Sequence, residues 1–65
     1  MKKTIKTKGM HCPSCEILLR EAIEEAGINV ISANHAKNEI VVDVKDESAL
    51  STAKKAIEKE GYKIA

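Results

Sequence analysis

Apolar and polar residues follow one another along this chain with two different periods, and the changes of period separate six short elements. Alternation at every second residue is typical of a strand with one buried face, whereas a spacing of three and four is typical of a helix. Residues 4–8 alternate, with Ile5 and Thr7 on one face. This pattern predicts a first strand, which ends at Gly9.

Two stretches have the helical spacing. The first covers residues 14–26, with Pro13 in its first turn, where the missing N–H costs nothing, and Gly27 as its C-terminal cap. Its apolar positions are Cys15, Leu18, Leu19, Ala22, Ile23 and Ala26. The second begins near Ser48, a natural N-cap, and stops at Gly61. Its predicted buried positions are Leu50, Ala53, Ala56 and Ile57.

Three further strands are predicted from alternation. Residues 28–35 and 39–44 form a hairpin whose turn is Lys37–Asn38, because Asn tolerates a positive φ. Residues 62–64 form the last strand. Alternation along the second strand predicts that Ile31 and Ala33 share one face. They then lie opposite the alternating residues of the third strand, which are Ile40, Val42 and Val44.

The order of these elements predicts the fold class. Residues 22–30 and 56–64 repeat the same sequence of helix end, glycine and strand start, so the order is βαβ twice over. Two right-handed βαβ halves make a ferredoxin-like α+β fold, a βαββαβ open-faced sandwich. We expect a four-stranded antiparallel sheet with both helices on one face, and Lys6 and Lys8 on the solvated face.

The length and net charge of the chain limit its possible functions. A chain of 65 residues buries only about 60% of its unfolded surface, which predicts one domain, residues 1–65, with a thin core. A net charge of +1 argues against a nucleic-acid partner, and no apolar run is long enough for membrane insertion or a secretory signal. Two closely spaced cysteines cannot staple a secreted fold, so we expect a cytoplasmic protein with free thiols.

The chemistry of the chain lies in one run, Gly-Met-His-Cys-Pro-Ser-Cys-Glu at residues 9–16. Cys12 precedes the first helix and Cys15 enters its first turn, where the helix dipole stabilises thiolates. Such a pair suits a soft ion that accepts two ligands, and Cu(I) is the foremost candidate. Zn(II) prefers four ligands, which only His11, His35, acidic side chains or water are available to complete.

Two other readings of the thiols stay open. A dithiol oxidoreductase uses a Cys-x-x-Cys pair, and Cys-Pro-Ser-Cys resembles the Cys-Pro-Tyr-Cys of glutaredoxins. That resemblance would imply a longer chain and a second proline, in cis, beside the thiols, whereas Pro13 is the only proline here. An inert buried pair is the structural alternative. Cys15 lies on the apolar stripe of the helix, but Cys12 lies in a loop with small polar neighbours and should be accessible.

The Met-x-Cys-x-x-Cys run after a strand, the helical stripe and the late Gly-Tyr resemble the heavy-metal-associated (HMA) domain family. This family comprises small copper chaperones, N-terminal metal-binding domains of P-type ATPases and mercuric-ion-binding proteins. The resemblance implies that Cys12 and Cys15 are the metal ligands. It also implies that Met10 packs beneath the loop and that Tyr62 shields the bound ion. His11 replaces the usual Thr or Ser, and is a candidate third ligand or a solvated neighbour.

The same resemblance implies a carrier and not an enzyme. It implies Cu(I) delivery by ligand exchange to a metal-transporting P-type ATPase domain or a similar Cys-x-x-Cys protein, with Zn, Cd or Hg carriage or sensing as the alternative. The carrier would be a monomer or a metal-bridged dimer. Residues 12–26 carry four glutamates and one arginine, so the helix beside the site is acidic. Thr7 and His35 occupy places that are often apolar in the family.

Overall fold

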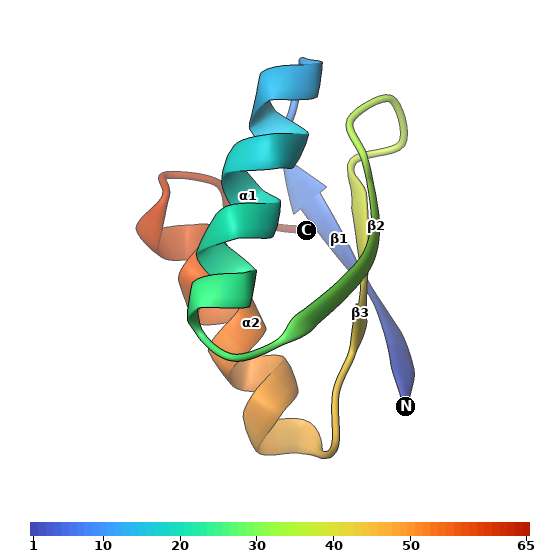
Figure 1. Cartoon of the computed structure of the whole chain (residues 1–65). Coiled ribbons are helices and arrows are strands. Elements are labelled where there is room, and N and C mark those ends of the chain that lie inside the picture. The colour runs from blue at the N-terminus through green and yellow to red at the C-terminus, as the bar shows by residue number, and fades with distance from the viewer.

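All six predicted elements form in the computed structural model, which describes residues 1–65. Their bounds are β1 Lys2–Lys8, α1 Pro13–Glu25, β2 Asn29–Asn34, β3 Glu39–Asp43, α2 Glu47–Lys59 and β4 Lys63–Ile64. The strands lie in the order β2-β3-β1-β4, and each neighbouring pair is antiparallel. Both helices cover one side of this sheet (Figure 1). The predicted ferredoxin-like βαββαβ sandwich is therefore confirmed.

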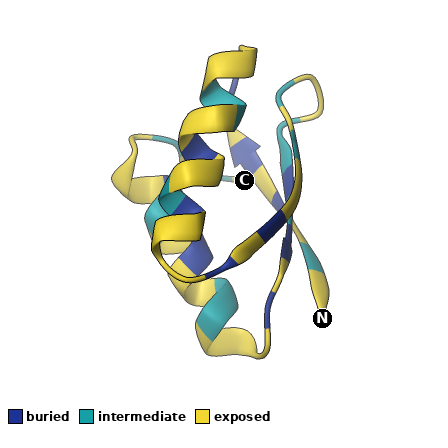
Figure 2. Cartoon of the chain, viewed as in Figure 1, coloured by how far each residue is buried: buried dark blue, intermediate teal, exposed yellow.

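An aliphatic layer between the helices and the sheet forms the core (Figure 2). One cluster contains all the buried hydrophobic residues: Ile5, Met10, Leu19, Ile23, Ile28, Val30, Ile40, Val42, Val44, Ala53 and Ile57. Tyr62, the only aromatic residue, is partly buried against this cluster. Each fully buried aliphatic side chain contributes about 1.5–3 kcal/mol relative to its exposed state. The fold therefore depends on a small number of side chains.

The first helix buries a narrower stripe than its sequence predicts. Leu19 and Ile23 are completely buried, whereas Leu18 is 44% exposed and Ala26 is also exposed. Neighbouring residues on a helix point about 100° apart, so two consecutive leucines cannot both face the sheet. The four positions predicted for α2 are fully or partly buried: Leu50, Ala53, Ala56 and Ile57. Neither helix is long and apolar enough to cross a membrane.

A β-bulge changes the faces of β2. The register of β2 against β3 shifts between Val30 and Ser32, so one extra residue stands in β2. That residue, Ile31, is 39% exposed, while Val30 is buried and Ala33 packs against the core. The prediction that Ile31 and Ala33 share a face is therefore wrong, because a bulge interrupts the alternation of the strand.

The helix ends follow local side-chain chemistry. Both helices stop as predicted, where Gly27 and Gly61 adopt φ values of +88° and +93°. The N-cap of α2, however, is Asp46 and not Ser48. Its side chain accepts a hydrogen bond from the Ala49 backbone N–H at 2.9 Å. A carboxylate at this position also complements the positive end of the helix dipole, which explains why the earlier residue takes the cap.

Thr7 is the only buried polar residue of the chain. It lies on the core face of β1, two residues after Ile5, and is 3% exposed. Its backbone N–H donates to the Asn38 carbonyl oxygen at 2.8 Å, but its Oγ1 atom has no hydrogen-bond partner. A buried hydroxyl without a partner costs about 1–3 kcal/mol.

Replacing Thr7 by Val should therefore stabilise the protein. The substitution keeps the β-branched shape and removes the unpaired hydroxyl, so we expect the free energy of unfolding to rise by about 1 kcal/mol. Urea unfolding of both proteins measures the difference. Thr4→Val, at an exposed position of the same strand, is the matched control and should change stability by less than about 0.5 kcal/mol. A less stable Thr7→Val protein would contradict the argument.

Candidate metal centre

Both cysteines lie where the segment after β1 enters α1, at the end of α1 that is uppermost in Figure 1. Gly9 ends the strand with a φ of +95°, a conformation that L side chains rarely adopt. Met10 then enters the core and is completely buried, while its backbone N–H donates to Asn38 Oδ1 at 3.0 Å. The burial of Met10 fits the supporting role that the family resemblance implies. Residues 9–15 are called the metal loop below.

Cys12 and Cys15 lie on the two sides of the helix start. Cys12 is the N-cap of α1 in an extended conformation and is exposed, whereas Cys15 lies in the first turn and is half-buried. The Cys15 backbone N–H donates to the Cys12 carbonyl oxygen at 3.0 Å. Both thiols are free, and their Sγ atoms are 3.2 Å apart. The turn therefore brings the two predicted ligands within reach of one ion.

The start of α1 favours negative charge on these sulfurs. Pro13 occupies the first turn, and no side chain caps the helix. The N–H groups of a first helical turn have no partner within the helix, and together with the helix dipole they stabilise an anion placed beside them. A thiolate, the form that binds metals, is therefore favoured at this position.

Tyr62 acts on Cys15 from the segment between α2 and β4. Hydrogen bonding by the Tyr62 side chain is the largest cause that lowers the pKa of Cys15 from 9.0 to about 7, and hydrogen bonds from Cys12 and from the His11 backbone add to it. The same interaction raises the pKa of Tyr62 to about 12, so its hydroxyl stays a donor at neutral pH. The Tyr62 ring lies beside Gly9, where an added Cβ would be 3.7 Å from Cδ1.

The structure brings no third protein ligand to the thiols. No group of three or more His, Cys, Asp or Glu side chains is arranged to hold a metal ion. His11 is exposed in the metal loop, and His35 is bonded to Glu16. Two sulfurs suit a soft ion of low coordination, whereas structural zinc sites take four ligands.

The turn between β2 and β3 contacts the residue that follows the metal loop, which the sequence did not predict. Glu16, the residue after Cys15, accepts a hydrogen bond from the His35 backbone N–H at 2.7 Å through Oε2, and His35 Nδ1 lies 2.5 Å from the same oxygen. The backbone hydrogen bond from His35, followed by that of its ring, holds the pKa of Glu16 below its usual value. The only feature of the sequence that pointed to this contact was His35, at a position that is often apolar in the HMA family.

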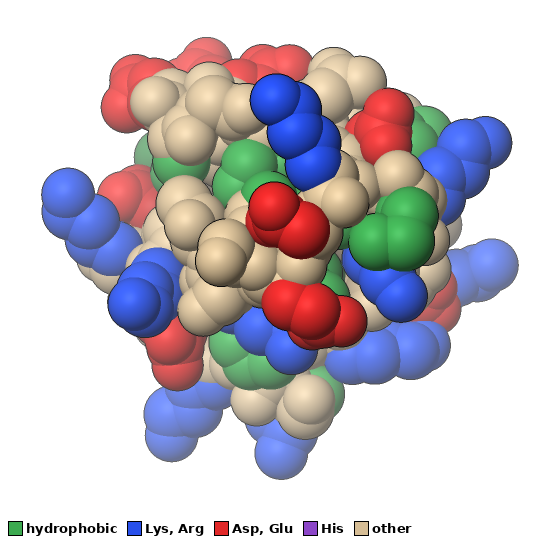
Figure 3. All heavy atoms as spheres, turned by 90° about the horizontal axis from the view of Figure 1, so that it is seen from below, with side chains coloured by type: hydrophobic (Ala, Val, Ile, Leu, Met, Phe, Trp, Pro, Cys, Tyr) green, Lys and Arg blue, Asp and Glu red, His purple; other side chains and the backbone are tan.

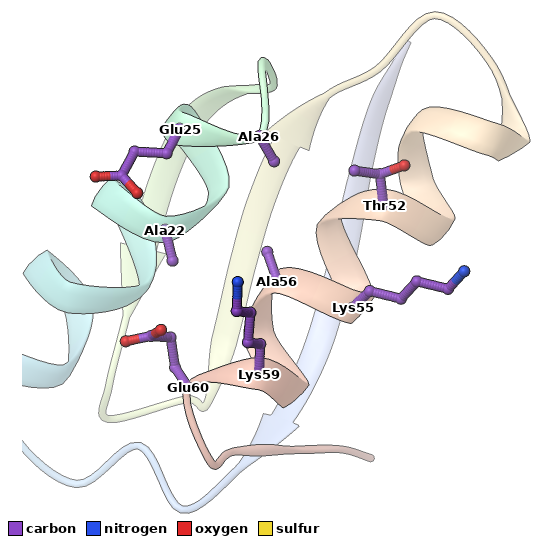
Figure 4. Close-up of a pocket in the computed structure, with 8 residues that line it drawn as sticks. All are labelled: Ala22, Glu25, Ala26, Thr52, Lys55, Ala56, Lys59 and Glu60. Carbon is purple, nitrogen blue, oxygen red and sulfur yellow. The ribbon is translucent and has the colours of Figure 1, made fainter.

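Neither thiol lies in a surface cavity. None of the three surface cavities is lined by Cys12 or Cys15. The groove of about 380 Å³ between the helices lies elsewhere, where Ala22 of α1 and Ala26, directly after α1, point toward Ala56 of α2 (Figure 4). At the end of the molecule opposite the metal loop, lysine and acidic side chains are interspersed (Figure 3). Of the two thiols, Cys12 is the one exposed to solvent, and Cys15 is half-buried.

One family model, that of the heavy-metal-associated domain, matches the sequence over residues 4–63. The chain belongs to this family. The matched range contains the whole metal loop and five of the six elements completely or nearly so. Membership of the HMA family supports metal binding as the general function of the chain.

Solved structures share this HMA fold. The CopZ metallochaperone is 26% identical, with a TM-score of 0.82 and full coverage of both chains. A structure described under the words "Crosstalk between Cu(I) and Zn(II) homeostasis" is 27% identical, with a TM-score of 0.81, and covers 100% of this chain and 96% of its own. A heavy metal binding protein from Thermotoga maritima, 20% identical, shares the fold with a TM-score of 0.83 over 98% and 91% of the chains. Comparison with curated proteins gives no match.

Replacing Tyr62 by Phe should weaken the thiolate form of Cys15. The ring stays, but the substitution removes the hydroxyl, which is the largest cause of the lowered pKa of Cys15, so we expect this pKa to rise from about 7 toward 9.0. At neutral pH a larger fraction of the thiol is then protonated. Titration of the Cys15 Cβ chemical shift by NMR measures the change. Ser14→Ala removes an exposed hydroxyl of the same loop and should leave the titration unchanged; an equal effect of both substitutions would contradict the assignment to Tyr62.

Proposed function

We propose that the protein binds one Cu(I) ion between the Sγ atoms of Cys12 and Cys15 and passes it to another protein by exchange of thiolate ligands. The observation that carries this proposal is the pair of free thiols, one exposed and one half-buried, with Sγ atoms 3.2 Å apart and without a third protein ligand. Cu(I) is soft and accepts low coordination by sulfur. The likeness to a metallochaperone supports a carrier and not a catalyst. Free thiols fit a reducing compartment such as the cytoplasm.

Binding requires both sulfurs to reach one ion. Metal–thiolate bonds are about 2.3 Å long in zinc sites, and two such bonds in a line separate the sulfurs by about 4.6 Å. The Sγ atoms of Cys12 and Cys15 are 3.2 Å apart, which lies within that span. Cys12 is exposed and precedes the helix, while Cys15 is half-buried within the first turn. Adjustment of the sulfur pair to the ion therefore falls mainly on Cys12.

Release follows as an exchange of sulfur ligands. A thiolate of the partner forms a bond to the ion, which then has three sulfur ligands. The bond to the exposed Cys12 breaks first, and the released thiolate takes a proton from water. A second partner thiolate then replaces Cys15 in the same way. No electron is transferred, and no free ion is needed.

The partner that fits this exchange is a protein with its own pair of thiolates, such as the metal-binding domain of a P-type ATPase. The first helix next to the site carries four glutamates and one arginine within residues 12–26. Docking along this helix would therefore favour a basic partner surface. The carrier acts as a monomer, or as a dimer in which one ion bridges thiolates of two copies.

The second candidate function is carriage of another thiophilic ion. The description of one structural relative names both Cu(I) and Zn(II), so zinc is the first alternative, with Cd(II) and Hg(II) after it. The absence of a third protein ligand favours Cu(I) over Zn(II), because zinc would need two ligands from water or from a partner.

Substitution of either cysteine should abolish tight Cu(I) binding. With one thiolate left, the ion loses half of its protein ligands, so we expect Cys12→Ala and Cys15→Ala to bind Cu(I) at least about a thousandfold more weakly. Anaerobic competition with a Cu(I) chelator measures the affinity. Ser14→Ala, between the two thiols, is the control and should bind as the wild type does. Equal affinity in a cysteine variant would rule out the proposed site.

The identity of the ion is decided by a series under the same anaerobic conditions. The wild-type protein is titrated with Cu(I), Zn(II), Cd(II) and Hg(II), each against a chelator of known affinity. We expect one Cu(I) per chain and a Zn(II) complex that loses its metal to far weaker chelators. Tight zinc binding with a stoichiometry of one would move the assignment to the second candidate.

A further inference from the structure

The β2–β3 turn, residues 35–38, bonds to the chain on both sides of the cysteines. Before them, the Met10 backbone N–H donates to Asn38 Oδ1 at 3.0 Å. After them, Glu16 Oε2 accepts from the His35 backbone N–H at 2.7 Å and lies 2.5 Å from His35 Nδ1. No hydrogen bond joins residues 11–14 to this turn. The turn therefore touches the ends of the cysteine segment and leaves its middle free.

The turn is itself well fixed. Asn38 adopts a φ of +53°, and its carbonyl oxygen accepts a hydrogen bond from the Thr7 backbone N–H at 2.8 Å. At the other side of the turn, the Lys37 backbone N–H donates to Asn34 Oδ1 at 3.2 Å. These bonds tie the turn to its own strand and to β1. The side chains of His35 and Asn38 are thus held by a rigid support.

We propose that Glu16, His35 and Asn38 are positioning residues that clamp the two ends of the cysteine segment, so that the sulfur pair opens only by movement of residues 11–14. The inference rests on the proposed function, because it assigns the clamp to retention of the ion. None of the three residues is a metal ligand. Each acts through Met10 or through the first turn of α1.

The clamp has a consequence for the ion. The two sulfurs must adjust their positions when an ion enters between them, and the clamp confines that movement to Cys12. Cys15 stays in place, because the next residue is bonded twice to the turn. Glu16 and His35 have side chains that are only 27% and 34% exposed, so water competes weakly for their contact. With the Cys15 sulfur fixed and the movement of the Cys12 sulfur confined, the site stays close to two-coordinate and loses its ion more slowly.

The test removes each half of the clamp separately. Glu16→Ala deletes the acceptor for His35, and Asn38→Gly deletes the acceptor for Met10 while glycine keeps the positive φ of the turn. Hydrogen exchange of the Cys15 amide is read in the metal-free protein, since its own acceptor, the Cys12 carbonyl, is unchanged in both variants. We expect this exchange, and the release of Cu(I) to an excess of chelator, to become about tenfold faster.

Two controls separate the clamp from general stability. Glu21→Ala removes an exposed carboxylate from the same helix, and Ile23→Val weakens the core at a distance from the metal loop. Both should leave the exchange rate of the Cys15 amide and the Cu(I) release rate near wild type. Glu16→Gln keeps an acceptor oxygen, so it should bring both rates most of the way back from the Glu16→Ala values to the wild-type values. Unchanged Cys15 exchange in both clamp variants, or an equal increase in Ile23→Val, overturns the inference. A wild-type protein that binds no Cu(I) would overturn the proposed function, while the amide exchange would still decide the clamp.

Discussion

Burial of the Met10 side chain is the contact on which the position of the metal loop depends. Met10 belongs to the same cluster as Leu19 and Ile23, which hold α1, and as Ile5 of β1. The aliphatic layer therefore fixes the strand before the loop, the helix after it and one residue inside it. With these three points set, the chain between them has only a few residues in which to place both cysteines. The core thus fixes where the segment with both cysteines lies, and the first turn of α1 then brings the two sulfurs together.

Two kinds of interaction surround Met10: apolar packing in the core and polar contacts near the surface. Apolar packing gives the fold its stability, and a few polar contacts near the surface adjust the chemistry of the sulfurs. Tyr62 lowers the pKa of one thiol, and the β2–β3 turn bonds to the chain before and after the pair. The polar contacts thus act on the sulfurs from the edge of the aliphatic layer.

The architecture and the position of the thiol pair could be predicted from the sequence, because both produce periodic or local patterns of residues. Alternation, helical spacing and glycine stops predicted every element, and the Cys-x-x-Cys run stands at a helix start that the structure confirms. The bulge at Ile31 was missed, since one inserted residue leaves the composition of a strand unchanged. The sequence does not decide between Asp46 and Ser48 as the cap of α2, because Asp and Ser are equally good caps by residue type. The pairing of Glu16 with His35 joins residues 19 apart and has no sequence period at all.

The shortness of β4 has a consequence for the chemistry of the thiols. Two residue pairs join β4 to β1, whereas five pairs join β1 to β3 and five join β2 to β3. Segments held by few hydrogen bonds open locally at a lower free energy than the whole domain. Tyr62 stands directly before this strand, so the side chain that lowers the pKa of Cys15 belongs to the part of the sheet that opens most readily. Local opening at this end would raise the pKa of that thiol while the aliphatic core stays folded.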